Sequence, residues 1–185
     1  LCDRRQRQMC IRDSSYIMIQ GDPENIDAQL RTEYSVKALT DAGVEVEQLD
    51  LQRGDWDRNK GQEICQNDLT KYGAEVEVVF CNNDGMAEGA ISALNDKGYN
   101  LGTGKDGKMI PVFGVDATDA AKQLIGDGKM TATVKQDADG MAACIADLAK
   151  NAADGKDLMD GTDSYNISDK VSNKIFIPYQ EYSGK

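Results

Sequence analysis

Histidine is absent from all 185 residues of this chain. Its absence removes the Ser-His and Cys-His nucleophile systems and the commonest metal ligand of proteins. Paired cysteines are also absent, because the five cysteines form no CxxC pair and no short-spaced zinc pattern. Cys81 and Cys144 fall at apolar positions of predicted elements, so we expect both to be core thiols. The residue types present therefore favour neither an enzyme nor a zinc centre.

Positive charge and long apolar runs are scarce as well. The formal net charge is −11, so we expect no nucleic-acid partner, because binding phosphates needs a basic surface. No apolar run is long enough to cross a bilayer, and the basic residues 4–8 are followed by no apolar stretch typical of a signal peptide. A hydrophobic content of 40% and a charged content of 29% are typical of a globular domain.

Residues 1–14 differ from the rest of the sequence. They are basic while the remainder is acidic, and they show neither the helical nor the strand period. One interpretation is an arm that binds nucleic acid. The other, which we favour, is a tag, a cloning scar or sequence wrongly joined to the gene. We therefore predict that residues 1–15 are an extraneous leader.

From Tyr16 onward, short runs rich in β-branched residues alternate with segments of helical spacing. The predicted strands are 16–19, 44–51, 76–81, 109–115, 129–135 and 174–178, and the predicted helices are 27–42, 57–72, 85–97, 118–125 and 137–154. This alternation predicts right-handed βαβ units, whereas an antiparallel sandwich would need hairpin turns that the sequence lacks. The predicted fold class is α/β, with a parallel sheet and helices on both faces.

Polar side chains follow the predicted strands at their carboxyl ends. They are Asn25, Asp27 and Arg31, then Trp56, then Asn83 and Asp84, then Asp116, and finally Gln136 and Asp137. In open α/β sheets, ligands bind at this edge. The mixture suits a polyhydroxyl ligand, because carboxylates, amides and Arg exchange hydrogen bonds with hydroxyls and an aromatic ring covers the C–H face of a pyranose.

Each of these residues also has a purely structural interpretation. Asp27, Asp57 and Asp84 could be helix N-caps, and Trp56 could belong to the core. The segment 102–108 resembles a phosphate-binding loop, but it lacks the final Ser or Thr and precedes a strand. We therefore expect no nucleotide site there.

Several segments, in order along the chain, carry a family resemblance. They are residues 21–23, 27, 31–32, 56–57, 77–79, 82–87, 110–117, 147–151, 154–156 and 177–179. Over residues 16–182 the chain resembles the galactose- and glucose-binding branch of the periplasmic binding protein family. The resemblance implies a lobe of a two-lobed fold that closes on one hexose, with the first lobe largely missing from this chain.

The resemblance assigns roles to individual residues. It implies that Asp27, Arg31, Asn83 and Asp116 hydrogen-bond the sugar and that Trp56 stacks on one of its faces. These five residues are also among those that follow the predicted strands.

The resemblance also bears on three further positions. Asn25 and Gln136 align with sugar-binding positions at which the family usually has His and Asn. Glu77 aligns with a calcium ligand, but the loop that supplies the other ligands would lie just before Tyr16, where the leader stands instead. We therefore expect no certain cofactor in this chain. The resemblance implies calcium binding only for the full-length protein.

The implied function is that of the substrate-binding component of an ABC importer, without catalysis. It would bind a hexose such as galactose or glucose, with the ABC permease and, in some members, a chemoreceptor as partners. The implied location is the periplasm, or the outer surface for a membrane-anchored lipoprotein. The alternative is the sugar-sensing core of a LacI-type transcription repressor, which shares the fold but needs a helix-turn-helix before the first lobe.

The resemblance also predicts the domain limits. Residues 16–136 would form the C-terminal sugar-binding lobe, and residues 137–185 a crossover helix and strand of the other lobe, followed by a tail. We expect the apolar side made by Met141, Cys144, Ile145 and Leu148 to lack its cover. We also expect sugar binding to be weak, because a single lobe cannot close around a ligand.

Overall fold

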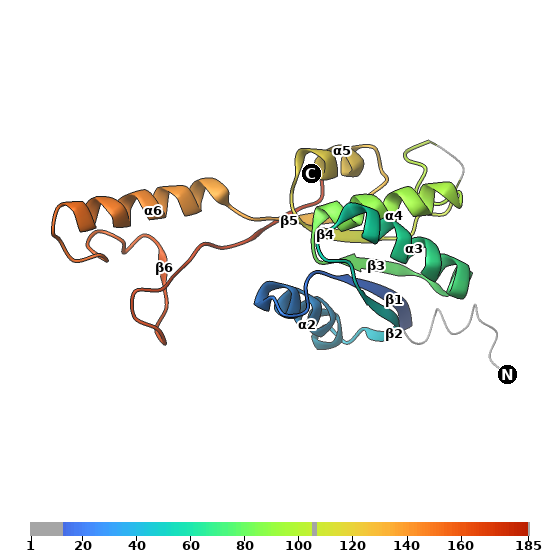
Figure 1. Cartoon of the computed structure of the whole chain (residues 1–185), viewed down its shortest axis with the longest axis horizontal. Helices are drawn as coiled ribbons and strands as arrows, with labels where there is room; N and C mark the ends of the chain where they lie inside the picture. The colour runs from blue at the N-terminus through green and yellow to red at the C-terminus, as the bar shows by residue number, and fades with distance from the viewer. Residues whose placement is uncertain (1–12, 105–106, 185) are drawn as a thin grey trace. The chain divides into compact units, whose positions relative to one another are not determined.

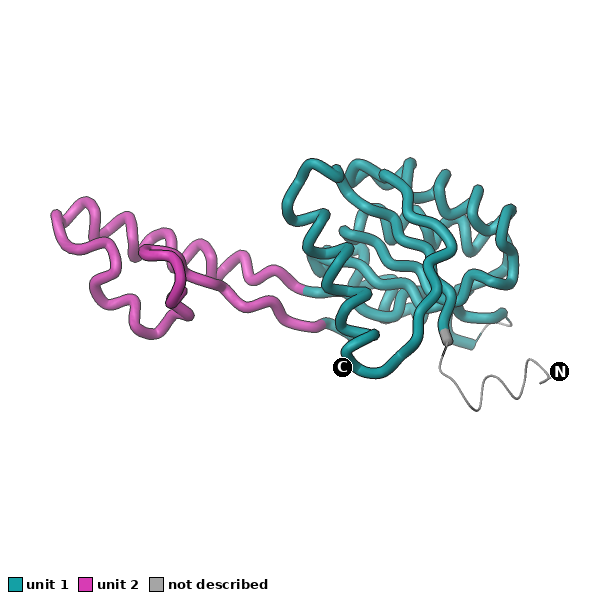
Figure 2. The backbone as a smooth tube through the Cα atoms, turned by 90° about the horizontal axis from the view of Figure 1, so that it is seen from below, with its two compact units in different colours: residues 1–134, 182–185 teal, residues 135–181 magenta. Residues whose placement is uncertain are grey.

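The structure is a computed structural model that describes residues 13–104 and 107–184 (Figure 1). Of the predicted leader, residues 1–12 lie outside the described residues. The chain divides into two compact units, residues 1–134 with 182–185 and residues 135–181, which Figure 2 shows in two colours. Each unit is described by itself. Within the described part of the chain, every helix is too short or too polar to span a membrane.

A six-stranded sheet forms the centre of the first unit, in the order β2-β1-β3-β4-β5-β8. Its strands are β1 (Asp13–Gln20), β2 (Glu45–Arg53), β3 (Val78–Cys81), β4 (Val112–Asp116), β5 (Ala132–Lys135) and β8 (Gln180–Tyr182). The pairs β1/β2, β1/β3 and β3/β4 are parallel. The predicted α/β fold with a mostly parallel sheet is confirmed.

Four α-helices connect these strands and cover both faces of the sheet (Figure 1). They are α2 (Ile26–Asp41), α3 (Arg58–Tyr72), α4 (Asp84–Asp96) and α5 (Asp119–Gly126), and the short 3-10 helix η1 (Gly73–Glu75) follows α3. The connection from β1 to β2 runs in the opposite direction to those that lead from β2 to β5. Because such crossovers are right-handed, α2 lies on one face and α3, α4 and α5 lie on the other.

The core follows the strand period. In β1, Ile17 and Ile19 belong to the larger cluster with α3, α4 and α5, whereas Tyr16 and Met18 belong to a smaller cluster with α2. Phe80 of β3 joins the smaller cluster, where its ring stacks on Phe113 with centroids 5.5 Å apart. Since both faces of the central strands are buried, these strands consist of continuous apolar runs rather than alternating ones.

Some predicted boundaries need correction. β1 begins at Asp13, and Asp13, Ser14 and Ser15 pair with residues 45–47 of β2, so residues 13–15 belong to the sheet although we grouped them with the leader. β5 begins at Ala132 rather than at residue 129. The reason is that the amides of Lys129 and Met130 both donate to the Leu124 carbonyl and so close the turn after α5.

The second unit consists of α6 (Ala138–Ala153) and a small antiparallel pair, β6 (Asn166–Ile167) and β7 (Ile175–Phe176). Asp137 caps α6 by accepting a hydrogen bond from the Gly140 amide at 3.1 Å. The predicted strand 174–178 is reduced to β7. On α6, Met141 and Ile145 are exposed, whereas Cys144 is buried, as Cys81 is in the first unit. Both predictions of buried thiols are thus confirmed.

Candidate functional site

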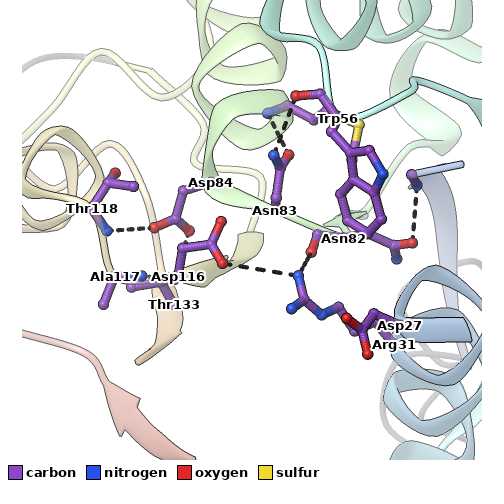
Figure 3. A network of polar contacts seen from close by, with 12 residues as sticks. Asp27, Arg31, Trp56, Asn82, Asn83, Asp84, Asp116, Ala117, Thr118 and Thr133 are labelled. Atoms are coloured by element: carbon purple, nitrogen blue, oxygen red, sulfur yellow. Dashed lines mark hydrogen bonds and ion pairs between the residues drawn. The ribbon is translucent and has the colours of Figure 1, made fainter. Parts of the chain in front are cut away.

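The polar residues predicted to form a site surround the carboxyl ends of β1, β3 and β4. The connections from the neighbouring strands β1 and β3 lead away in opposite directions, which makes this point the topological switch of the sheet. In open α/β sheets, ligands bind outside the strand ends at such a point. Figure 3 shows the residues that meet there, which come from α2, the β2–α3 connection, the start of α4 and the end of β4.

Arg31 of α2 connects these elements. Its Nη1 donates to the Asn82 carbonyl at 2.8 Å and lies 3.9 Å from Oδ1 of Asp116. Its guanidinium carbon is 5.6 Å from the centroid of the Trp56 ring, within cation–π range. The side chain is only 15% exposed. Its Nε is buried and meets no acceptor among the described residues, so one hydrogen-bond donor of this cation is left unsatisfied by the protein.

Trp56 lies in the connection between β2 and α3. Asp55 and Trp56 both have positive φ, 51° and 63°, which is uncommon for residues other than glycine. A Cβ on Gly21 would collide with the indole ring, so the absence of a side chain at Gly21 lets the ring lie against the β1–α2 turn. The Trp56 carbonyl also accepts from Nδ2 of Asn83 at 3.2 Å. Trp56 thus packs against the core and borders Arg31, so the two interpretations of this residue are compatible.

Asn82 is a part of the site that our sequence-based list omits. Its side chain is 1% exposed, its Oδ1 accepts from the Gly21 amide at 3.0 Å, and its Nδ2 donates to Oγ1 of Thr32 at 3.2 Å. These bonds attach the end of β3 to the β1–α2 turn and to α2. The available signal was an amide directly after an apolar strand, since a buried amide must find partners.

The N-caps of α2 and α4 are asparagines, not the aspartates that could have served as caps. Asn25 caps α2 by accepting from the Asp27 amide at 2.8 Å, and Asn83 caps α4 by accepting from the Met86 amide at 3.0 Å. The cap interpretation is therefore wrong for Asp27 and Asp84. It is confirmed for Asp57, which accepts from the Lys60 amide at 2.9 Å. Asp27 is exposed in the first turn of α2, beside Arg31 in Figure 3.

Asp116 ends β4 with a φ of 126°, and Ala117 follows with a φ of 55°. Asp84 lies buried next to this turn, where its Oδ2 accepts from the Thr118 amide at 2.8 Å and its Oδ1 from the Thr133 hydroxyl at 2.6 Å. Burial raises the pKa of Asp84, and these hydrogen bonds act against that rise. The structure thus brings Arg31, Trp56, Asn83 and Asp116 together.

Gln136 and Glu77 lie in other parts of the chain. Gln136 directly follows β5 and falls in the second unit. Glu77 precedes β3, and its Oε2 accepts from the Ser15 amide at 3.1 Å. In the part of the chain that the structure describes, no three acidic or cysteine side chains are placed to hold a metal ion. Glu77 alone does not fit calcium, which needs six or more oxygen ligands.

Comparisons with known proteins give the family context of this geometry. Residues 6–157 match the family described as the periplasmic binding protein domain. Over 165 residues the chain is 34% identical to the D-galactose/methyl-galactoside binding periplasmic protein MglB of Haemophilus influenzae, which covers 89% of this chain and 46% of that protein. The chain spans about half the length of the curated relatives it matches first.

Solved structures agree with this context. A solute-binding protein of an ABC transporter from Bacillus halodurans, with bound myo-inositol, is 27% identical and superposes with a TM-score of 0.72 over 97% of this chain and 55% of its own. Another from Actinobacillus succinogenes, with bound D-allose, reaches a TM-score of 0.76 over 96% of this chain and 56% of its own. At 17% identity, the second likeness shows the fold alone.

Proposed function

This chain belongs to the periplasmic binding protein domain family, and from that premise we propose that it binds a monosaccharide for an ABC importer. The sugar would lie at the carboxyl ends of β1, β3 and β4. It would be captured without being chemically changed and passed to the membrane permease. The proposed location is the periplasm.

The observation that carries this proposal is the environment of Arg31. A buried donor without an acceptor costs about 1–3 kcal/mol, so the buried Nε marks a place where an acceptor from outside would be favourable. Beside it stand a carboxylate, Asp116, and an indole face, Trp56. A sugar hydroxyl can accept a hydrogen bond from Arg31 and another can donate one to Asp116. The C–H face of the sugar can pack on the Trp56 ring.

We propose a hexose, galactose or glucose, as the sugar, because the relative of 34% identity is named for galactose. Asp27, Arg31, Asn83 and Asp116 would hydrogen-bond it, Trp56 would stack on it, and Asn25 and Gln136 would add contacts. The bound myo-inositol of the Bacillus halodurans protein makes related polyols the natural competitors. A chemoreceptor partner and a lipid anchor rest on the family resemblance alone.

We also propose that residues 16–136, together with residues 13–15 of β1, belong to one lobe. The helix and strand within residues 137–181 would belong to the part of the chain that crosses to the other lobe, and residues 182–185 return to the first unit. The division into compact units between residues 134 and 135 supports this limit. The repressor alternative has less support, because the first-matched relative is a periplasmic binding protein.

Titration calorimetry with D-galactose, D-glucose, D-allose, D-ribose and myo-inositol tests the proposal. We expect one hexose to bind with an affinity weaker than micromolar, and Arg31→Met to abolish that binding. Lys37→Met is the matched control, because Lys37 is an exposed cation on the same helix and pairs with the likewise exposed Asp41. Absence of binding across the panel, or binding that survives Arg31→Met, would contradict the proposal.

A further inference from the structure

The β4–α5 connection holds its backbone in an uncommon conformation at the point where it presents a charged side chain. Asp116 and Ala117 are consecutive residues with positive φ, and neither is a glycine. Such conformations cost about 1–3 kcal/mol each and persist only where surrounding structure holds them. Asp116 is nevertheless turned toward α2, with Oδ1 3.9 Å from Nη1 of Arg31.

Asp84 supplies the surrounding structure. Its side chain is fully buried, and both of its oxygens accept hydrogen bonds that lead to this connection. Oδ2 accepts directly from the Thr118 amide. Oδ1 accepts from the Thr133 hydroxyl, whose oxygen accepts in turn from the Ala117 amide at 3.3 Å. The two residues after Asp116 are therefore fixed from one carboxylate (Figure 3).

The neighbouring strand leaves space for this carboxylate. A Cβ built on Gly114 of β4 would collide with Oδ1 of Asp84, so the strand can pass the carboxylate only because residue 114 has no side chain. The carboxylate also faces the charge of Asp116, which raises its pKa further after burial has done so. A buried acid next to a second acid is costly unless its hydrogen bonds are made.

We propose that Asp84 is the positioning residue of the site: through Thr118 and Thr133 it holds the strained turn that aims Asp116 at Arg31 and the sugar. This inference rests on the proposed function in one respect, namely that Asp116 contacts the sugar. It makes Asp84 a residue that touches the turn and not the ligand.

The experiment is a double-mutant cycle between residues 84 and 116, read by calorimetry with D-galactose and D-glucose. We expect Asp84→Asn to weaken the affinity about tenfold, because a hydrogen bond to a charged group is lost. In an Asp116→Ala background the same change should alter affinity less than about twofold, because Asp84 acts only through Asp116. Asp119→Asn, an exposed acid at the start of α5, is the matched control.

Thr133 provides a second variant pair should Asp84→Asn fail to fold. Thr133→Val keeps the shape and removes the hydroxyl, so it should weaken sugar affinity, whereas Thr133→Ser keeps the hydroxyl and should restore it. Amide hydrogen exchange at Ala117 and Thr118, in the protein without sugar, should be faster in Thr133→Val than in Thr133→Ser.

These measurements separate the two claims. Unchanged affinity in both Asp84→Asn and Thr133→Val, or an equal loss with and without Asp116, would overturn the positioning role while leaving sugar binding in place. If the native protein bound neither hexose, the proposed function would fail, and the exchange rates alone would then test the positioning role of Asp84. Faster exchange at Ala117 and Thr118 in Thr133→Val would support the positioning role, and equal exchange in the two variants would overturn it.

Discussion

The two faces of the sheet in the first unit are packed to different degrees. On one face, α3, α4 and α5 form the larger cluster, and α3 and α4 approach so closely that Gly61 and Gly89 have no room for a side chain. On the other face, α2 buries only Ala28 completely and leaves Ile26, Leu30 and Tyr34 exposed. Yet α2 carries Asp27 and Arg31. The densely packed face thus supports the sheet, while the lightly packed helix brings the charged residues to the site.

Gly89→Ala should produce the largest effect in this comparison. Its Cβ would collide with the Arg58 carbonyl oxygen and lie 2.7 Å from the Gln62 nitrogen, both backbone atoms of α3. Overpacking against backbone should cost about 3 kcal/mol or more of the free energy of unfolding. Gly126→Ala in α5 is the control, because a Cβ there meets nothing within 4 Å. Urea unfolding gives both values, and equal stability of the two variants would contradict the dense packing of α3 on α4.

Leu94→Ala and Leu39→Ala compare the two faces directly. Leu94 of α4 is completely buried in the larger cluster, and Leu39 of α2 is half-buried against the smaller one. We expect about 3 kcal/mol for the first and about 1 kcal/mol for the second, since the cost follows the buried volume that is lost. The same urea titration measures both. Equal losses would mean that α2 is held as firmly as α4.

The pH dependence of stability should reveal a buried carboxyl group where α3 meets β2. Asp68 of α3 is 2% exposed, and burial together with the hydrogen bond and charge of Asp50 raises its pKa to about 7. The native state therefore binds this proton more tightly than the unfolded state, where the ordinary value of 3.8 applies. The stabilisation is complete below pH 3.8 and is lost as the pH rises through about 7.

Asp68→Asn should remove this loss. Between pH 5 and pH 8 the native chain should lose about 2 kcal/mol relative to the variant. Asp50 does not mask the effect. Although burial acts to raise the pKa of Asp50, hydrogen bonds with Gln52 and Asp68 lower it, so its own contribution changes at acidic pH. Urea unfolding across this pH range checks the prediction, and parallel curves for the two proteins would contradict it.

Asn25→Ala should have the smallest effect, on the lightly packed side. The Asn25 side chain caps α2, and losing a cap costs about 1 kcal/mol. Because α2 carries Arg31, amide exchange should become faster in the first turns of α2 and remain unchanged in α4. Equal acceleration in both helices would show that α2 does not open separately from the rest of the unit.

The sequence predicts the elements well because each has a local cause. Gly43 ends α2, Thr118 starts α5, and β-branched runs form the strands, all within a few residues of the expected limits. Composition misled the prediction for residues 13–15, whose polar character suggests a foreign leader although their backbone pairs with β2. Pairing depends on the partner strand, which local composition does not contain.

The site also contains some residues that the sequence could predict and others that it could not. Arg31, Trp56, Asn83 and Asp116 could be grouped from the sequence because each follows a strand whose carboxyl end meets the same edge. The choice of Asn25 over Asp27 and of Asn83 over Asp84 as caps depends on backbone angles at the helix starts, which no pattern specifies. The support given by Asn82 joins residues far apart in the chain, so only the folded structure contains it.

The position of Trp56 makes the chain its own optical reporter. It is the single tryptophan among 185 residues, its ring lies against Gly21, and the guanidinium of Arg31 is 5.6 Å from the ring centroid. A ligand that draws Arg31 away from the indole would change the emission of one chromophore with no background from others. Intrinsic fluorescence can therefore follow events at this edge of the sheet without a label.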